Sequence, residues 1–249
     1  MLHSLNLAND ATEVRASASV KLYGDGATLA DFARLHQEGV VTGFTTNPSL
    51  MRRAGVADYA AFGRDLLDLI PDMPISFEVI ADDFSEMRRQ ALLLASWGPN
   101  VYVKIPITNT KRESSLPLIA ELSAMGVKVN VTAILTLEQV AGAVEALHPE
   151  TPAVISIFAG RIADTGLDPM PIMRAAVAMA ARRPLAEVLW ASIREVLNVY
   201  QAQECGCHII TATPDLLKKL DMAGKDLADL SAETVAMFDT DARAAGYSL

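Results

Sequence analysis

The sequence predicts an α/β fold, a single-domain (β/α)8 barrel with a C-terminal closing helix. Short β-rich runs alternate with amphipathic helical segments about eight times, the number of units that this barrel requires. Several of the β-rich runs are almost continuously apolar, which is typical of parallel strands buried on both faces. The length of 249 residues also suits one barrel. We expect one domain over residues 1–249, with the barrel core at about 20–222 and a helical segment at about 223–249.

The predicted elements follow one another along the chain. The strands are predicted at Val20–Asp25, Val41–Asn47, Ile75–Ile80, Val101–Pro106, Val127–Ala133, Ala153–Phe158, Val188–Ser192 and Cys207–Thr211. The helices are predicted at Thr28–Glu38, Asp58–Leu69, Phe84–Trp97, Lys111–Ala124, Leu137–Ala146, Pro169–Arg182, Arg194–Glu204, Pro214–Leu220 and Leu230–Ala245. Pro169 and Pro214 near a first turn, and Thr136 as a cap, mark helix starts. A doubly wound open sheet would usually carry a Gly-rich phosphate turn after its first strand, and Tyr23-Gly-Asp-Gly-Ala27 does not match that turn.

Composition narrows the class of function. The formal net charge is −9 and no Lys/Arg-rich run is present, so we expect neither a nucleic-acid partner nor an anionic membrane surface. No segment approaches the roughly 20 apolar residues of a membrane span. The N-terminus has neither the basic nor the apolar region of a signal peptide, and we expect a soluble, cytoplasmic protein.

The cysteines lie together as Cys205 and Cys207, next to His208. They are too close in sequence for an expected disulfide, and a closed metal site normally needs a second group of ligands elsewhere. We expect buried cysteines at the start of a strand and no metal.

Polar residues occur near the ends of almost all the predicted strands. They are Asp25, Thr45, Asn47, Glu78, Lys104, Asn130, Thr132, Ser156, Ser192 and Thr211. Within each strand they alternate with apolar neighbours, as side chains that point into a barrel do. Because the chemistry of such barrels collects at the C-terminal ends of the strands, we expect these groups to meet at one mouth.

Lys104 is the candidate nucleophile. It lies within the apolar run Val101-Tyr-Val-Lys-Ile-Pro106. Burial lowers the pKa of an amine, and a partly neutral amine can attack a ketone carbonyl. The alternative is a lysine that extends to solvent at a strand end or pairs with Glu78. The run by itself does not decide between these interpretations.

Nearby carboxylates could transfer protons for such a nucleophile, and nearby arginines could bind its substrate. Asp25 and Glu78 are the carboxylates at inward strand ends, and imine formation and carbon–carbon cleavage both need proton transfers. Arg161, Ser192 and Arg194 follow two late strands, where barrels often bind phosphate. The alternative is a pair of ordinary surface arginines.

Five motifs together resemble those of the transaldolases, in particular the short branch that includes fructose-6-phosphate aldolase-like proteins. The resemblance extends from about Lys21 to Thr213. Its motifs are Gly43-Phe-Thr-Thr-Asn-Pro-Ser-Leu50, Val103-Lys-Ile-Pro106, Asn130-Val-Thr132, Ile155-Ser-Ile-Phe-Ala-Gly-Arg-Ile162 and Ala191-Ser-Ile-Arg194. The Thr-Thr-Asn-Pro-Ser block with Lys104 two units later is highly specific.

The resemblance implies a role for each position. By this resemblance Lys104 looks like the Schiff-base lysine, and Asp25 looks like the acid/base group of carbon–carbon cleavage. Glu78 and Thr132 look like the pair that holds a catalytic water. The groups that bind the dihydroxyacetone portion are Asn47, Asn130 and Ser156, with Thr45 in support, and those that bind phosphate are Arg161, Ser192 and Arg194. No metal or organic cofactor is implied, because the protonated imine is the electron sink.

Two positions distinguish the branches of the family. The free-aldolase branch tends to have Gln in place of Glu78 and Tyr in place of Phe158. The resemblance therefore implies a transaldolase that moves a dihydroxyacetone unit from a phosphorylated ketose to an aldose acceptor. Two alternatives stay open: an aldolase that releases free dihydroxyacetone, and a non-catalytic barrel that acts as a binding protein.

Three positions depart from the family pattern. Ile157 replaces a frequent Pro, Ile193 a frequent Phe and Glu195 a frequent Asn. An acidic neighbour can weaken a phosphate site or redirect Arg194, so a donor with a different anion also stays open. The small-molecule partners expected are sugar phosphates. Short relatives often form rings, which implies a homo-oligomer in which the helix at Leu230–Ala245 could mediate contacts.

Overall fold

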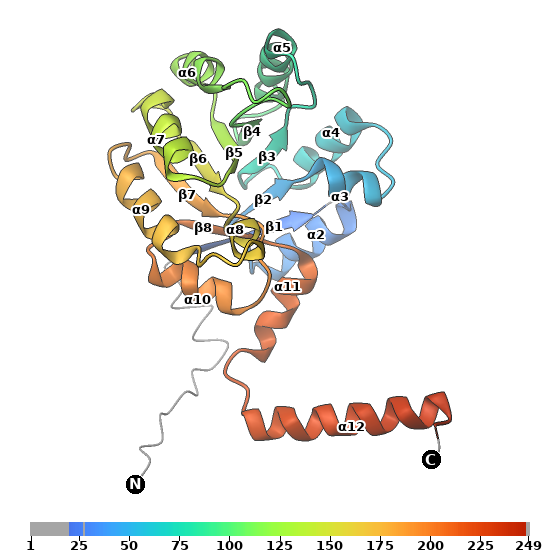
Figure 1. Ribbon diagram of the computed structural model, residues 1–249. Helices are drawn as coiled ribbons and strands as arrows, with labels where there is room; N and C mark the ends of the chain where they lie inside the picture. Colours follow the sequence, from blue (N-terminus) through green and yellow to red (C-terminus); the bar gives the residue numbers. More distant parts are fainter. Residues whose placement is uncertain (1–19, 27, 248–249) are drawn as a thin grey trace. The chain divides into compact units, whose positions relative to one another are not determined.

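A closed parallel barrel is the central feature of the protein (Figure 1). The computed structural model describes residues 20–26 and 28–247. Within these residues, eight parallel strands pair in chain order, and β8 closes the barrel against β1. The strands are β1 Lys21–Gly26, β2 Gly43–Thr46, β3 Ile75–Glu78, β4 Val101–Pro106, β5 Val129–Ile134, β6 Ala153–Ile157, β7 Ala186–Trp190 and β8 Ile209–Ala212. The predicted fold class is confirmed.

Helices surround the strands (Figure 1). They are α2 Leu29–Glu38, α3 Pro48–Arg53, α4 Tyr59–Leu69, α5 Phe84–Ala95, α6 Leu116–Ala124, α7 Leu137–Ala146, α8 Ala159–Asp164, α9 Met170–Ala180, α10 Leu197–Glu204 and α11 Pro214–Lys219. Side-chain caps define several helix starts: Thr28 accepts from Asp31 N, and Thr136 forms a capping box with Gln139.

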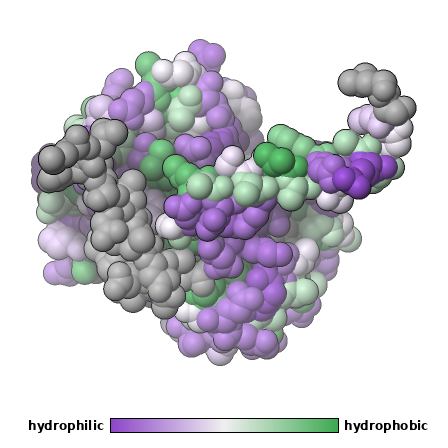
Figure 2. Space-filling view, turned by 90° about the horizontal axis from the view of Figure 1, so that it is seen from below, coloured by the Kyte–Doolittle hydropathy of each residue, from purple (hydrophilic) through white to green (hydrophobic). Residues whose placement is uncertain are grey.

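The chain divides into two compact units. One is Ala18–Leu217, which holds the barrel, and the described part of the other is residues 218–247. The second unit contains the short 3-10 helix Leu220–Met222 and α12, Leu227–Ala245, which begins three residues before the predicted start because Asp226 caps it. Apolar side chains of α12 lie at the surface beside charged ones (Figure 2). The expectation of a single domain over the whole chain stays a prediction.

The largest differences between the structure and the predicted elements concern three helices. The short helices α3 and α8 fall in segments for which no helix was predicted, and α6 begins at Leu116 rather than at Lys111. Residues 107–115 instead form a turn that brings Thr108 opposite Ser114. Arg112 in this turn has a φ of 66°, which does not fit a helix.

Apolar side chains fill the barrel interior nearer the N-terminal ends of the strands than the polar groups lie. Tyr23, Val154, Leu189 and Ile209 form a buried cluster there, and the half-buried Tyr102 packs against it. Gly43 makes room for this cluster, because a Cβ at that position would lie 2.5 Å from the Tyr23 ring. The barrel is therefore packed at this level, and its polar side chains lie nearer the C-terminal ends of the strands. Among the described helices, none is long and apolar enough to cross a bilayer.

Candidate active site

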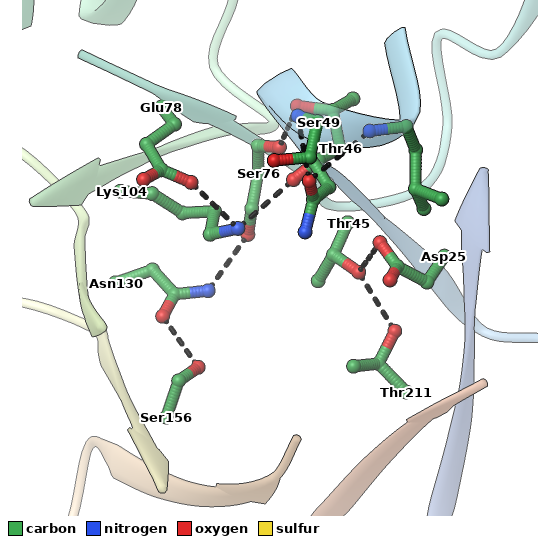
Figure 3. Close-up of polar contacts among 12 residues, drawn as sticks. Asp25, Thr45, Thr46, Ser49, Ser76, Glu78, Lys104, Asn130, Ser156 and Thr211 are labelled. Atoms are coloured by element: carbon green, nitrogen blue, oxygen red, sulfur yellow. Dashed lines mark hydrogen bonds and ion pairs between the residues drawn. The ribbon is translucent and has the colours of Figure 1, made fainter. Parts of the chain in front are cut away.

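Lys104 is buried and paired. It lies on β4 with a side chain that is 8% exposed, level with Glu78 on β3 and Asn130 on β5. Its Nζ is 3.0 Å from Glu78 Oε2 and donates to the backbone oxygen of Thr46 at 2.9 Å (Figure 3). The two interpretations of Lys104 were thus not exclusive, because it is both a buried amine at the barrel mouth and the partner of Glu78.

Asp25 lines the same pocket as Lys104, from the β1 side (Figure 3). Burial raises the pKa of this carboxyl, and the positive charge of Lys104 and the hydrogen bond from Thr45 only partly oppose that effect. Thr45 Oγ1 donates to Asp25 Oδ1 at 2.9 Å and lies 2.7 Å from Thr211 Oγ1. The carboxyl is therefore held in place by neutral hydroxyl groups and keeps a proton more readily than an exposed aspartate.

A second polar chain crosses the strands β3, β5 and β6. Asn130 Nδ2 donates to Ser76 Oγ at 3.1 Å, and Ser156 Oγ donates to Asn130 Oδ1 at 2.6 Å. These side chains are buried, and their mutual hydrogen bonds fix the Asn130 amide. Ser76 was not among the predicted site residues, although its position two residues before Glu78 gives it the same inward direction.

Asn47 and Thr132 both line the pocket of Lys104. Asn47 Oδ1 accepts the amide protons of Ser49 and Leu50 as the cap of α3. Its Nδ2 group has no hydrogen-bond partner among the described residues and could therefore bind a ligand. Thr132 Oγ1 is buried without a hydrogen-bond partner among the described residues. A buried hydroxyl in a pocket wall that lacks a protein partner is suited to bind a water or a substrate group.

Arg161 and Ser192 reach the pocket from the ends of β6 and β7. The Arg161 guanidinium stacks over Phe158, 5.1 Å from the ring centre. Ser192 has a φ of 64°, and the carbonyl of this residue packs so closely on α8 that a Cβ at Gly160 would lie 1.6 Å from its oxygen. The short helix α8 and the end of β7 therefore fit together only because residue 160 is glycine.

The structure brings most of the predicted site residues together. The pocket is lined by Asp25, Thr45, Asn47, Lys104, Thr132, Phe158, Arg161, Ser156 and Ser192, and also by Leu189, Ala191 and Thr211. Glu78 contacts Lys104 but lines a neighbouring hollow with Pro106 and Thr108.

Arg194 lies outside the pocket lining, as do Glu78 and Asn130. Its Nε and Nη2 groups both bind the carboxylate of Asp164, with Nε donating to Oδ1 at 3.0 Å. This pairing lowers the pKa of Asp164. The predicted neighbour Glu195 is not the residue that engages Arg194. Sequence reasoning missed Asp164, which lies 30 positions away in a helix that was not predicted.

The cysteines are buried and free. Burial raises the pKa of both thiols, that of Cys207 to about 12. Over the part of the chain that the structure describes, no three His, Cys, Asp or Glu side chains gather into a possible metal site. The expectation that no metal takes part stays a prediction.

Known proteins resemble this chain in sequence. Residues 22–249 match the family described as Transaldolase/Fructose-6-phosphate aldolase. A probable transaldolase of Dehalococcoides mccartyi is 33% identical over 203 residues, which cover 81% of this chain and 90% of that protein. A probable transaldolase 2 of Listeria monocytogenes is 35% identical over 202 residues, 81% of this chain and 88% of that protein. A probable transaldolase of Thermoanaerobacter is 32% identical over 231 residues, 92% of this chain and 100% of that protein.

Solved structures resemble it in fold. The crystal structure of KGPDC from Streptococcus mutans superposes with a TM-score of 0.55, at 12% identity, over 83% of this chain and 94% of that one. At this identity the likeness supports the barrel architecture alone.

Proposed function

Since this chain belongs to the transaldolase/fructose-6-phosphate aldolase family, we propose that it transfers a dihydroxyacetone unit from an anionic ketose to an aldose through a Schiff base on Lys104. The observation that carries the proposal is the environment of Lys104. Its amine is buried, touches the carboxylate of Glu78 and lines a pocket that also contains Asp25. A nucleophilic amine, a nearby base and a second acid/base group are the parts that this reaction needs.

The first half-reaction begins with a proton transfer from Lys104 to Glu78 across the 3.0 Å contact. The neutral amine then attacks the ketone carbon, and loss of water gives a protonated imine. Asp25 takes the proton of the β-hydroxyl group, the adjacent carbon–carbon bond breaks, and its electron pair moves into the imine. An aldose leaves, and a three-carbon enamine stays on Lys104.

The second half-reaction reverses these steps with a different aldehyde. The enamine carbon attacks the carbonyl of the acceptor, and Asp25 returns its proton to the new hydroxyl group. Water then hydrolyses the imine and frees Lys104. We assign this water to the space between Glu78 and Thr132, because the Thr132 hydroxyl is the buried group without a protein partner among the described residues of the pocket. The imine serves as the electron sink, so the proposal calls for no metal or organic cofactor.

Arg161 and Ser192 are the proposed contacts for the anion of the donor. Arg161 lines the pocket, whereas two nitrogens of the Arg194 guanidinium, Nε and Nη2, already bind the Asp164 carboxylate. The charge available to a ligand at this end of the pocket is therefore mainly that of Arg161. A phosphate fits such a site, and so does another anion that one guanidinium can bind.

Borohydride reduction in the presence of fructose 6-phosphate tests the proposal. We expect a reduced adduct on the peptide that contains Lys104, found by mass spectrometry. An adduct on another lysine would contradict the role of Lys104. No adduct with any ketose donor would contradict the Schiff-base mechanism and favour a binding role.

A second assay separates transfer from free aldol cleavage. Purified protein is incubated with fructose 6-phosphate in the presence and in the absence of erythrose 4-phosphate. The proposal expects product only when the acceptor is present. Release of dihydroxyacetone without the acceptor would show an aldolase instead.

A further inference from the structure

Strand β2 does not extend as far as Glu78 at the end of β3. In the described structure β2 pairs with β3 at Phe44–Ile75 and Thr45–Ser76, and then the chain turns into α3. In a parallel sheet the backbone groups of alternate residues face opposite neighbours. Val79 N bonds to Lys104 O on β4, so the amide and carbonyl of Glu78 face the side that β2 has left.

Tyr59, the first residue of α4, occupies this place. Its hydroxyl donates to Glu78 O at 2.9 Å and accepts from Glu78 N at 2.8 Å. Burial raises the pKa of Tyr59 to about 12, so the phenol keeps the proton that it donates. The ring packs edge-on against Phe77 and is tilted against Trp97, with centroids 6.4 Å apart in both pairs. One hydroxyl thus satisfies two backbone groups that strand β2 would otherwise bind.

The consequence reaches Lys104. Glu78 is the last residue of β3, and its carboxylate lies 3.0 Å from Lys104 Nζ. The Tyr59 hydroxyl fixes the backbone of this same residue. Resting on the proposed function, we propose that Tyr59 is a positioning residue, whose hydroxyl replaces strand β2 at Glu78 and so holds the Glu78 carboxylate against the amine of Lys104. The residue touches no substrate and acts through Glu78.

Tyr59→Phe tests this assignment, because it removes the hydroxyl and keeps the ring. The probe is dihydroxyacetone, trapped on Lys104 with borohydride and followed by mass spectrometry across pH. We expect the trapping rate at neutral pH to fall about tenfold, less than the roughly 10²- to 10⁴-fold of a lost proton-transfer group, because Glu78 itself remains. The pH at which trapping is half-maximal should also change, because the variant holds the Glu78 carboxylate on β3 less firmly beside Lys104. The other carboxyl group that interacts with Lys104 is Asp25 on β1.

Phe62→Leu is the matched control. Phe62 lies on the same helix, is 8% exposed and packs on Phe32, so this variant loses core packing on α4 without touching the hydroxyl of Tyr59. We expect trapping and its pH profile to stay as in the wild type at equal folded fraction. If Tyr59→Phe behaves like this control, the residue only supports the fold and the inference is wrong.

A double-mutant cycle shows whether Tyr59 acts through Glu78. In a Glu78→Gln background, adding Tyr59→Phe should cost less than about a twofold further loss, because coupled residues are not additive. Full additivity would overturn the inference.

Amide exchange gives a readout that does not depend on the proposed chemistry. The Glu78 amide should exchange faster in Tyr59→Phe than in the wild type. Absence of an adduct in the wild type would overturn the proposed function, whereas unchanged exchange would overturn the role of Tyr59.

Discussion

At the scale of single residues, the buried position of Asp25 suits its proposed role as an acid/base group but lowers the stability of the folded protein at neutral pH. Its pKa is raised, mainly by burial, although Lys104 and Thr45 oppose the effect. The folded protein thus binds the Asp25 proton more tightly than the unfolded chain does. The associated stability is present below the ordinary pKa of 3.8 and is lost as pH rises through the raised value.

Asp25→Asn should therefore trade activity for stability. We expect cleavage to fall by about 10²- to 10⁴-fold, the range for loss of a general acid/base group, while borohydride still traps an imine on Lys104. Thermal unfolding from pH 4 to 8 should show a stability gain that widens with pH. A gain of about 1 kcal/mol corresponds to roughly 2–4 °C for a domain of this size. A variant less stable than the wild type at neutral pH would contradict this account.

The polar strand ends were predictable, whereas their outer partners were not. Asp25, Lys104 and Thr132 follow from alternation along a strand, because inward side chains recur at every second residue. Tyr59 and Asp164 lie on helices and meet their partners only through the arrangement of the barrel. Nothing in the local sequence around Glu78 or Arg194 indicates those contacts.

At the scale of elements, short helices complete the mouth of the barrel. The helix α3 places Asn47 as its cap, and α8 carries Arg161 and Asp164. Each has six residues, which is too short for an amphipathic pattern to repeat, so periodicity alone could not predict them. The existence and order of the longer helices and of the apolar strands were predicted, because their patterns extend over several turns or over whole buried runs, although some helix starts such as that of α6 were not.

Gly160→Ala should disturb the anion end of the pocket and spare Lys104. The added Cβ would lie 1.6 Å from the Ser192 oxygen, so α8 or the end of β7 must move. A displacement of about 1 Å can cost about 100-fold. We expect the KM for fructose 6-phosphate to rise about tenfold or more, while trapping of dihydroxyacetone, which has no anion, changes little.

Gly142→Ala on α7 is the control for this change. The nearest atom to its new Cβ is the flexible end of Leu116, and alanine favours a helix over glycine by about 1 kcal/mol. Kinetics of this variant should match the wild type. Equal effects of Gly160→Ala on both substrates would show that the close contact supports the whole site rather than the anion pocket.

At the scale of the whole molecule, the barrel could be predicted from the sequence because the strand–helix pattern repeats eight times. The second unit is different, since α12 has no buried residue. Leu227, Leu230 and Phe238 lie on one face of this helix at helical spacing, and Leu227 and Phe238 are 76% and 61% exposed. An apolar face of this kind usually meets a partner.

We expect that partner to be a second copy of this chain, as the resemblance to ring-forming relatives implied. Phe238→Glu should weaken the assembly, because burial of one Phe side chain contributes about 1.5–3 kcal/mol and symmetry repeats the loss in every copy. Ala236→Glu adds the same charge about 200° around the helix and should leave the assembly intact. Sedimentation velocity at a common concentration compares the three proteins. A wild type that sediments as a monomer, or equal effects of both substitutions, would count against a homo-oligomer built through this face.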